Sequence, residues 1–191
     1  MTTRIILIIG KRGSGVTTLA NEIMNGVEPV IKCMTSFVAM GEIVQEINTC
    51  FDGINKSATC DFTYDGLDDA FDAFVKYKKN SQSSQSSQSW VLFDDCIFSR
   101  NAWSNKTIQE LMNRGQELNT SLIITMSYPL YFPPDVAKLL DFVYVMPVGF
   151  NYIQQIYDTH VKPKSNDTSF ASFVESYKQE CTGYGKYLLI S

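Results

Sequence analysis

The stretch IILIIGKRGSGVTTLANEIMN, which covers residues 5–25, carries the strongest fold signal in the chain. Its first part, Ile5–Ile9, is continuously apolar and rich in β-branched residues, the pattern of a strand buried on both faces of a parallel sheet. Glycines break this pattern between Gly10 and Gly15, and Thr17–Asn25 then places apolar residues on one helical face. The sequence therefore predicts a strand, a glycine-rich loop and a helix in succession.

The loop itself, GKRGSGVT at residues 10–17, follows the phosphate-loop pattern G-x-x-x-x-G-K-[ST] at every fixed position except one. In that pattern the glycines let backbone N–H groups turn toward phosphates, and the helix amino terminus adds partial positive charge. Val16 stands in the place of the lysine, and the Thr17 hydroxyl would coordinate Mg²⁺. A tight turn that binds nothing is the alternative. The expected nucleotide-binding residues are Gly10, Lys11, Arg12, Gly13, Ser14, Gly15, Val16, Thr17 and Thr18.

The missing lysine bears on chemistry more than on the fold. A lysine charge on the β- and γ-phosphates is worth about 1.5–3 kcal/mol, and it stabilises the charge that develops in phosphoryl transfer. Removing one such donor typically lowers the rate by about 10²–10³-fold. Nucleotide binding is therefore compatible with Val16, whereas hydrolysis needs a substitute cation, for which Lys11 and Arg12 are candidates.

A second motif, SWVLFDDC at residues 89–96, reads as an apolar strand that ends in two carboxylates. Asp94 would hold Mg²⁺ through water, and Asp95 would orient or deprotonate an attacking water. An apolar run ending in two aspartates is also typical of a solvated strand end. Together with the upstream phosphate loop, however, it has the form of a Walker B strand.

Strand and helix patterns alternate along the chain, which favours an α/β fold with a mainly parallel central sheet and right-handed crossovers. The length of 191 residues fits a single domain, 1–191. The low-complexity segment Asn80–Ser89 predicts a flexible surface loop. Further strands are expected at Pro29–Cys33, Ser121–Met126, Val143–Met146 and Tyr187–Ile190, and further helices at Glu42–Cys50, Gly66–Lys79 and Lys106–Glu117.

Composition excludes several classes of protein. With 45% hydrophobic and 19% charged residues, the chain is neither disordered nor a coiled coil. Its net charge of −4 provides no chain-wide basic field, so any contact with DNA must be local. The five cysteines lack metal-ligand spacing, and the amino-terminal apolar run is too short for a signal peptide or a membrane span. The single histidine, His160, lies in a polar segment and is expected to be exposed.

Three further segments carry a family resemblance: DDC (94–96), WSNKTIQELMNRG (103–115) and SLIITMSYPLYFPPDVAKLLDFVYVM (121–146). Together with the closing GYGKYLLIS, they resemble the DNA-packaging ATPases of large nucleocytoplasmic DNA viruses, within the FtsK–HerA superfamily of P-loop motors. The resemblance covers nearly the whole chain. It implies a P-loop NTPase of the ASCE/RecA-like class, a three-layer sandwich.

The resemblance also implies a function. Family members bind ATP with Mg²⁺ and couple its hydrolysis to translocation of double-stranded DNA into a capsid, as a homo-oligomeric ring. The implied location is the host cytoplasm (the viral factory) or the virion, with capsid or membrane-associated virion proteins as partners. By position, Asp95 would polarise the water, Ser127 would stand at the sensor position, and Arg114 would act across a subunit boundary.

This sequence departs from the family at positions that carry chemistry. Besides Val16, Ser127 replaces the sensor glutamine, and Ala137 and Leu139 stand where an arginine and an asparagine belong. Two hypotheses from different classes follow: a packaging ATPase, and a pseudo-ATPase that serves as a nucleotide-binding or structural ring subunit. A small nucleoside kinase suits the length but fits the paired aspartates poorly.

Overall fold

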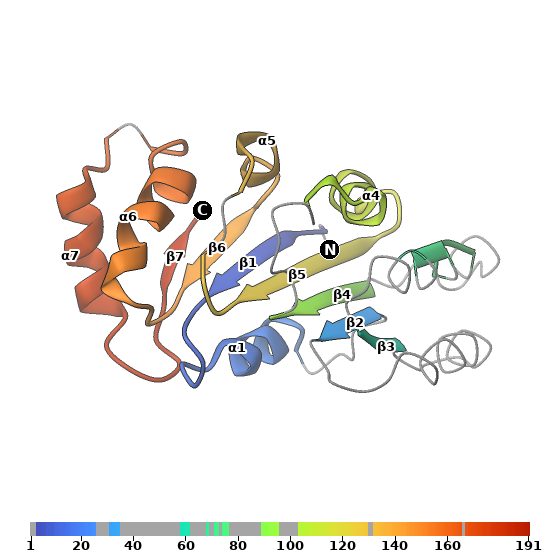
Figure 1. Cartoon of the computed structure of the whole chain (residues 1–191), viewed down its shortest axis with the longest axis horizontal. Coiled ribbons are helices and arrows are strands. Elements are labelled where there is room, and N and C mark those ends of the chain that lie inside the picture. Colours follow the sequence, from blue (N-terminus) through green and yellow to red (C-terminus); the bar gives the residue numbers. More distant parts are fainter. Residues whose placement is uncertain are drawn as a thin grey trace.

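The computed structural model describes residues 3–25, 31–34, 58–61, 68, 71–72, 74–76, 89–95, 103–129, 132–165 and 167–191. Within them, seven strands form one sheet in the order β3-β2-β4-β5-β1-β6-β7 (Figure 1). All neighbouring strands pair in parallel except β7, which runs antiparallel to β6. The strands are β1 (Ile5–Ile9), β2 (Ile31–Met34), β3 (Ala58–Asp61), β4 (Ser89–Asp94), β5 (Thr120–Met126), β6 (Phe142–Val145) and β7 (Leu188–Ile190).

Helices follow most of the described strands. Residues 68, 71–72 and 74–76 are also helical, within the range expected for a helix, whereas the helix expected at Glu42–Cys50 lies outside the described residues. The labelled helices are α1 (Val16–Ile23), α4 (Lys106–Arg114), α5 (Pro134–Ala137), α6 (Ile153–Ile156) and α7 (Phe170–Glu180), with a 3-10 turn η2 (Phe150–Tyr152) and a π-helical turn η3 (Tyr157–Val161).

The core lies on both faces of the sheet, which makes the fold a three-layer sandwich. Side chains alternate along β1, so that Ile6 and Ile8 pack with Leu19 and Ala20 of α1 on one face. The side chains of Leu7 and Ile9 point to the opposite face and join the larger cluster, to which α4, α5, α6 and α7 contribute. The α/β sandwich with a mainly parallel sheet is therefore confirmed.

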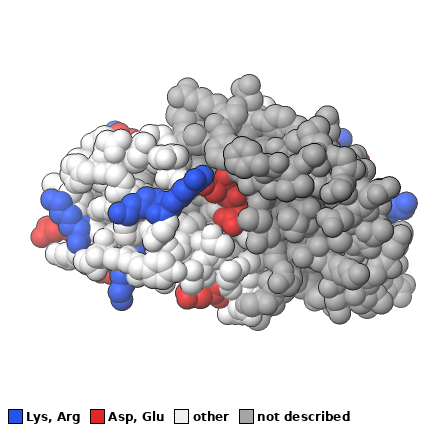
Figure 2. Space-filling view, turned by 60° about the horizontal axis from the view of Figure 1, so that its bottom comes forward, with Lys and Arg blue, Asp and Glu red and all other residues white. Residues whose placement is uncertain are grey.

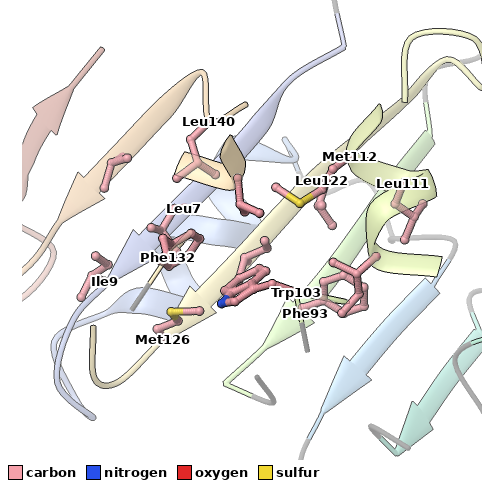
Figure 3. Close-up of a cluster of buried hydrophobic side chains, with 14 of the residues drawn as sticks. Leu7, Ile9, Phe93, Trp103, Leu111, Met112, Leu122, Met126, Phe132 and Leu140 are labelled. Carbon is pink, nitrogen blue, oxygen red and sulfur yellow. The ribbon is translucent and has the colours of Figure 1, made fainter. Parts of the chain in front are cut away.

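Trp103 and Phe132 lie in the larger cluster, with ring centroids 4.3 Å apart (Figure 3). Each is at most 2% exposed, and burying aromatic rings of this size contributes strongly to stability. Figure 3 also shows Leu111 and Met112 of α4 in the same cluster. Trp103 is thus a core residue.

Two expectations need correction. Ser89, expected to end the flexible loop, is buried and begins β4, where it pairs with Thr120 of β5; the rest of that loop, 80–88, lies outside the described residues. His160, expected to be exposed, is 2% exposed. It lies in the π-helical turn η3, and its ring makes an edge contact with Phe132. The expectation rested on the polar neighbours of His160 in the sequence, several of which line the same cavity as His160.

No helix among the described residues is long and apolar enough to span a membrane.

Candidate functional site

The glycine-rich loop leaves the carboxyl end of β1 and is fastened to both neighbouring strands. The Gly10 N–H donates to the Met126 carbonyl at the end of β5 (3.0 Å), and the Lys11 N–H donates to the Pro147 carbonyl after β6 (2.9 Å). A Cβ on Gly10 would lie 2.8 Å from the Met146 Cβ, so only glycine fits there. The start of the loop is therefore held rigidly at the centre of the sheet.

The loop then turns into α1 through two left-handed glycines. Gly13 has φ 78° and Gly15 has φ 102°, a region that other residues rarely adopt. Gly15 caps α1 without a side-chain hydrogen bond to the first turn. The first N–H groups of the helix are thus left for another acceptor, and an anion is the acceptor that a helix amino terminus favours.

The residues at this helix start line a pocket of about 290 Å³ at the carboxyl edge of the sheet. The pocket combines the glycine loop and the first turn of α1 with the ends of β4 and β5 and one residue from the carboxyl-terminal loop. The lining residues are Gly10, Lys11, Arg12, Gly13, Gly15, Val16, Thr17, Thr18, Asp94, Asp95, Thr125, Met126, Ser127 and Tyr184.

One hydroxyl, on Thr125, fixes both aspartates. Thr125 is the register partner of Asp94 across β4 and β5, and its Oγ1 donates to the Asp94 Oδ1 (2.8 Å). The same Oγ1 accepts from the Asp95 N–H (2.9 Å). Asp94 is 9% exposed, so its carboxylate is held at the inner wall of the pocket.

The Asp95 carboxylate makes contacts on three sides. Its Oδ1 accepts from the Ser127 N–H (2.9 Å), and its Oδ2 accepts from the Ser127 hydroxyl (2.8 Å). The Arg12 Nη2 lies 3.6 Å from the same Oδ2. Asp95 has φ 49°, a left-handed conformation that aspartate tolerates better than most residues. Ser127, at the expected sensor position, therefore orients the carboxylate predicted to act on water.

Nearly all the predicted nucleotide and metal residues meet in this pocket. Ser14 is the exception within the loop, because its buried hydroxyl donates to the Lys11 carbonyl (2.7 Å) and supports the turn from behind. Val16 lines the pocket but also packs against the cluster under α1. The pocket thus brings together the glycine-loop backbone and two carboxylates, and it has an aliphatic side chain at the position where the phosphate-loop pattern has lysine.

Arg114 lies outside the pocket. It ends α4, where its Nε donates to Glu117 (3.0 Å) and its Nη1 to Glu110 (3.3 Å), and the hydrogen bond and charge of Glu117 are the main causes that raise its pKa. The Thr120 N–H donates to the Gly115 carbonyl, so Arg114 is near the start of β5. The pocket lies beyond the other end of this seven-residue strand, roughly 20 Å away. Arg114 therefore cannot act on the pocket of its own chain.

Sequence reasoning missed three pocket residues, Thr125, Met126 and Tyr184. A threonine one residue before the end of the apolar run SLIITM was a usable signal, because parallel register places it beside the aspartate that ends the neighbouring strand. Tyr184 gave no local signal, since it is 166 residues from its partner Thr18 in sequence.

A second cavity of about 710 Å³ lies between α5 and the α6–η3 region, and its lining includes Phe132, His160 and Lys164. No residue predicted to bind nucleotide or metal lines it. Burial, with the Lys164 charge second, lowers the pKa of His160 to about 4. The His160 Nδ1 has no hydrogen-bond partner in the part of the chain that the structure describes.

No protein-family model matches the sequence, and no curated protein matches it. Solved structures do match. The genome packaging NTPase B204 from Sulfolobus turreted icosahedral virus 2, in complex with ATP-γS, matches with a TM-score of 0.63 and 13% identity over 97% of this chain and 91% of that one. Its AMPPCP complex gives 0.62 and 12% over 98% and 91%. The DNA-packaging ATPase B204 from Sulfolobus Turreted Icosahedral Virus gives 0.62 and 13% over 99% and 93%. The chain therefore shares the P-loop NTPase fold of these proteins, and this fold is the one that the sequence predicts.

Proposed function

We propose that this chain is a viral genome-packaging ATPase that binds Mg-ATP in the pocket at the amino terminus of α1. The observation that carries the proposal is the arrangement of an uncapped helix start opposite two carboxylates, Asp94 and Asp95, across one pocket. A helix start binds phosphate, and carboxylates hold the metal that accompanies it. The packaging NTPase of the same fold has been crystallised with ATP-γS and AMPPCP, which supports the choice of nucleotide.

The residues present fit Mg²⁺ bound together with a nucleotide. The described residues contain no group of three or more His, Cys, Asp or Glu side chains able to hold a metal alone. Mg²⁺ usually takes only one or two protein ligands beside phosphate and water, so the Thr17 hydroxyl and Asp94 suffice. When bound, the ion would neutralise charge on the phosphates. The backbone of Gly10–Thr18 would cradle the phosphates.

Asp95 is the residue that would polarise the attacking water. Each of its oxygens accepts one hydrogen bond from Ser127, and a carboxylate acts on a water by accepting its proton. The contact with Ser127 removes rotational freedom from the carboxylate, which is how preorganised groups contribute to catalysis. Ser127 thus acts as a positioning residue.

Lys11 and Arg12 would replace the missing lysine. Both line the pocket, and the Arg12 guanidinium is 86% exposed beside Asp95, so its pairing with that carboxylate is weak and screened. A bound triphosphate offers more negative charge than one carboxylate. Arg12 would therefore turn from Asp95 toward the phosphates when nucleotide binds.

At the level of the assembly, the chain would form a homo-oligomeric ring, act on double-stranded DNA and bind a capsid protein. Because Arg114 is remote from its own pocket, its role would be at the pocket of a neighbouring subunit. On the face shown in Figure 2, charged side chains of the described residues lie in small groups rather than in a continuous basic surface. With a net charge of −4, we expect few phosphate contacts per subunit and a small dependence of DNA affinity on salt.

A second candidate, a pseudo-ATPase that binds nucleotide or only supports a ring, is favoured by one observation. The position of the catalytic lysine is taken by Val16, which packs against the core cluster under α1. The two candidates differ in turnover, because a pseudo-ATPase binds nucleotide weakly or not at all and releases no phosphate.

The deciding experiment measures Mg-ATP binding and steady-state phosphate release by the purified chain, with and without double-stranded DNA. The packaging ATPase predicts turnover that rises with DNA, is lost in Asp95→Asn and falls in a Lys11→Ala, Arg12→Ala double variant. Arg114→Ala should lower turnover while nucleotide binding is kept. Nucleotide binding without phosphate release under any condition would establish a nucleotide-binding pseudo-ATPase instead. Absence of both would overturn the nucleotide site and leave only the structural ring subunit.

A further inference from the structure

The loop between α7 and β7 lies directly against the glycine loop at the other end of the chain. The Gly185 N–H donates to the Ser14 carbonyl (2.9 Å), and the hydroxyls of Tyr184 and Thr18 are hydrogen-bonded at 2.9 Å. A Cβ on Gly15 would lie 3.3 Å from both the Tyr184 Cζ and the Gly185 N. These contacts place the Tyr184 ring in the wall of the pocket.

The pocket has two chemically different sides. In the sheet order β4-β5-β1-β6-β7, Asp94, Asp95 and Ser127 come from the β4 and β5 side of the glycine loop. Tyr184 belongs to the loop that leads into β7, beyond β6 on the other side. A nucleoside triphosphate has a matching polarity, because a metal-bound phosphate end is joined to a flat, weakly polar base. With the terminal phosphate and its metal at the carboxylates, the base points toward Tyr184.

The Tyr184 ring is held in place and yet uncovered. The contacts with Thr18 and Gly15 fix the position of the ring, but Tyr184 is 68% exposed. A Cβ on Gly183 or on Gly185 would meet no atom within 4 Å beyond its chain neighbours, so the backbone on either side of Tyr184 borders open space. An exposed, oriented aromatic face beside free space is a stacking surface for another flat ring.

We propose that Tyr184 stacks on the base of the bound nucleotide and makes the site selective for nucleotides over bare polyphosphate. The proposal rests on the proposed Mg-ATP site and adds the residue that recognises the nucleoside. Every base has a π-face, so stacking distinguishes a nucleotide from polyphosphate and does not distinguish adenine from guanine.

The test compares binding of Mg-ATP-γS with binding of Mg-tripolyphosphate by isothermal titration calorimetry. Tyr184→Ala should weaken ATP-γS binding by about 5- to 100-fold and leave tripolyphosphate binding within about twofold. Tyr184→Phe, which retains the ring and loses the hydrogen bond to Thr18, should stay within about threefold of the native chain for both. Phe150→Ala is the matched control, because Phe150 is 63% exposed and does not line the pocket.

A loss of ATP-γS and tripolyphosphate affinity by the same factor in Tyr184→Ala would mean that the ring only holds the loop, and would overturn the proposal. Unchanged ATP-γS affinity would overturn it as well. A native chain that binds tripolyphosphate as tightly as ATP-γS overturns the stacking alone, whereas one that binds neither overturns the nucleotide site too. If Tyr184→Ala does not fold, Tyr184→Trp serves: its fluorescence should be quenched by ATP-γS and not by tripolyphosphate, and equal responses would count against stacking.

Discussion

Replacing Val16 with lysine tests whether this pocket lacks only one charge. Val16 is the first residue of α1, lines the pocket and is half-buried against the cluster that includes Ile8 and Leu19. A lysine stem can cover part of the same apolar surface while its ammonium reaches the pocket. Full burial of a valine is worth about 1.5–3 kcal/mol, so losing part of a half-buried one should destabilise the fold by about 1 kcal/mol or less.

The gain in the free energy of nucleotide binding should exceed this loss of folding stability. A charge-assisted contact of about 1.5–3 kcal/mol between the new ammonium and the phosphates corresponds to roughly 10- to 100-fold tighter binding of Mg-ATP-γS. If Asp95 and Ser127 are otherwise competent, phosphate release should rise by about 10²–10³-fold, because one preorganised electrostatic donor has that effect on rate. Val16→Met is the control, since it has a long unbranched side chain without the charge.

The assay is calorimetric titration with Mg-ATP-γS and steady-state phosphate release for the native chain, Val16→Lys and Val16→Met, each with its melting temperature. The reasoning is refuted if a folded Val16→Lys binds nucleotide no more tightly than Val16→Met. Tight native binding that Val16→Lys leaves unchanged, and that the Lys11→Ala, Arg12→Ala variant abolishes, would show that these two residues already supply the charge.

Three further predictions concern the surroundings of the site. Gly15→Ala should destabilise the fold by roughly 1–3 kcal/mol in chemical denaturation because of the left-handed backbone and the close approach of Tyr184, whereas Gly183→Ala should be nearly neutral; equal effects would contradict the strain. Thr125→Val should weaken Mg²⁺-dependent nucleotide binding, because the hydroxyl that holds Asp94 is removed, and Thr125→Ser should restore it. His160 has a folded pKa of about 4 against an ordinary 6.5, so the unfolded chain binds the extra proton and stability should fall as the pH drops from 6.5 to 4, by up to about 3 kcal/mol. His160→Leu should flatten that pH dependence, and an unchanged slope would assign it to other groups.

The carboxyl edge of the sheet could be predicted from the sequence because its signals are local. Ile5–Ile9 and Ser121–Met126 are apolar runs that read as buried strands, and the structure has β1 at the first and β5 one residue longer than the second. The glycine loop and the paired aspartates are continuous motifs, and parallel pairing brings the ends of their strands together. What the sequence predicted well is therefore what neighbouring residues determine.

The missed features depend on distant contacts or on weak periodicity. The strand Ala58–Asp61 contains no long apolar run. The region that forms η2, α6 and η3 passes through three helical types within Phe150–Val161, so it has no single period to detect. His160 was misjudged because its polar neighbours in the sequence predicted an exposed segment, whereas its ring is buried against Phe132, which is distant in the sequence.

The pocket keeps its shape without a lysine because backbone atoms and side-chain charge have different functions in a site of this kind. The proposed cradle for phosphates consists of backbone N–H groups, which the left-handed glycines and the bonds of Gly10 and Lys11 to neighbouring strands hold in place whatever residue stands at position 16. Valine there even adds to the packing under α1. Rate acceleration, by contrast, depends on side-chain charge, which one substitution removes. In the proposed site, one substitution can therefore separate nucleotide binding from turnover. Asp95, with Ser127 on both oxygens and Arg12 beside it, has the geometry that the proposed hydrolysis requires, and Val16→Lys would add the missing charge.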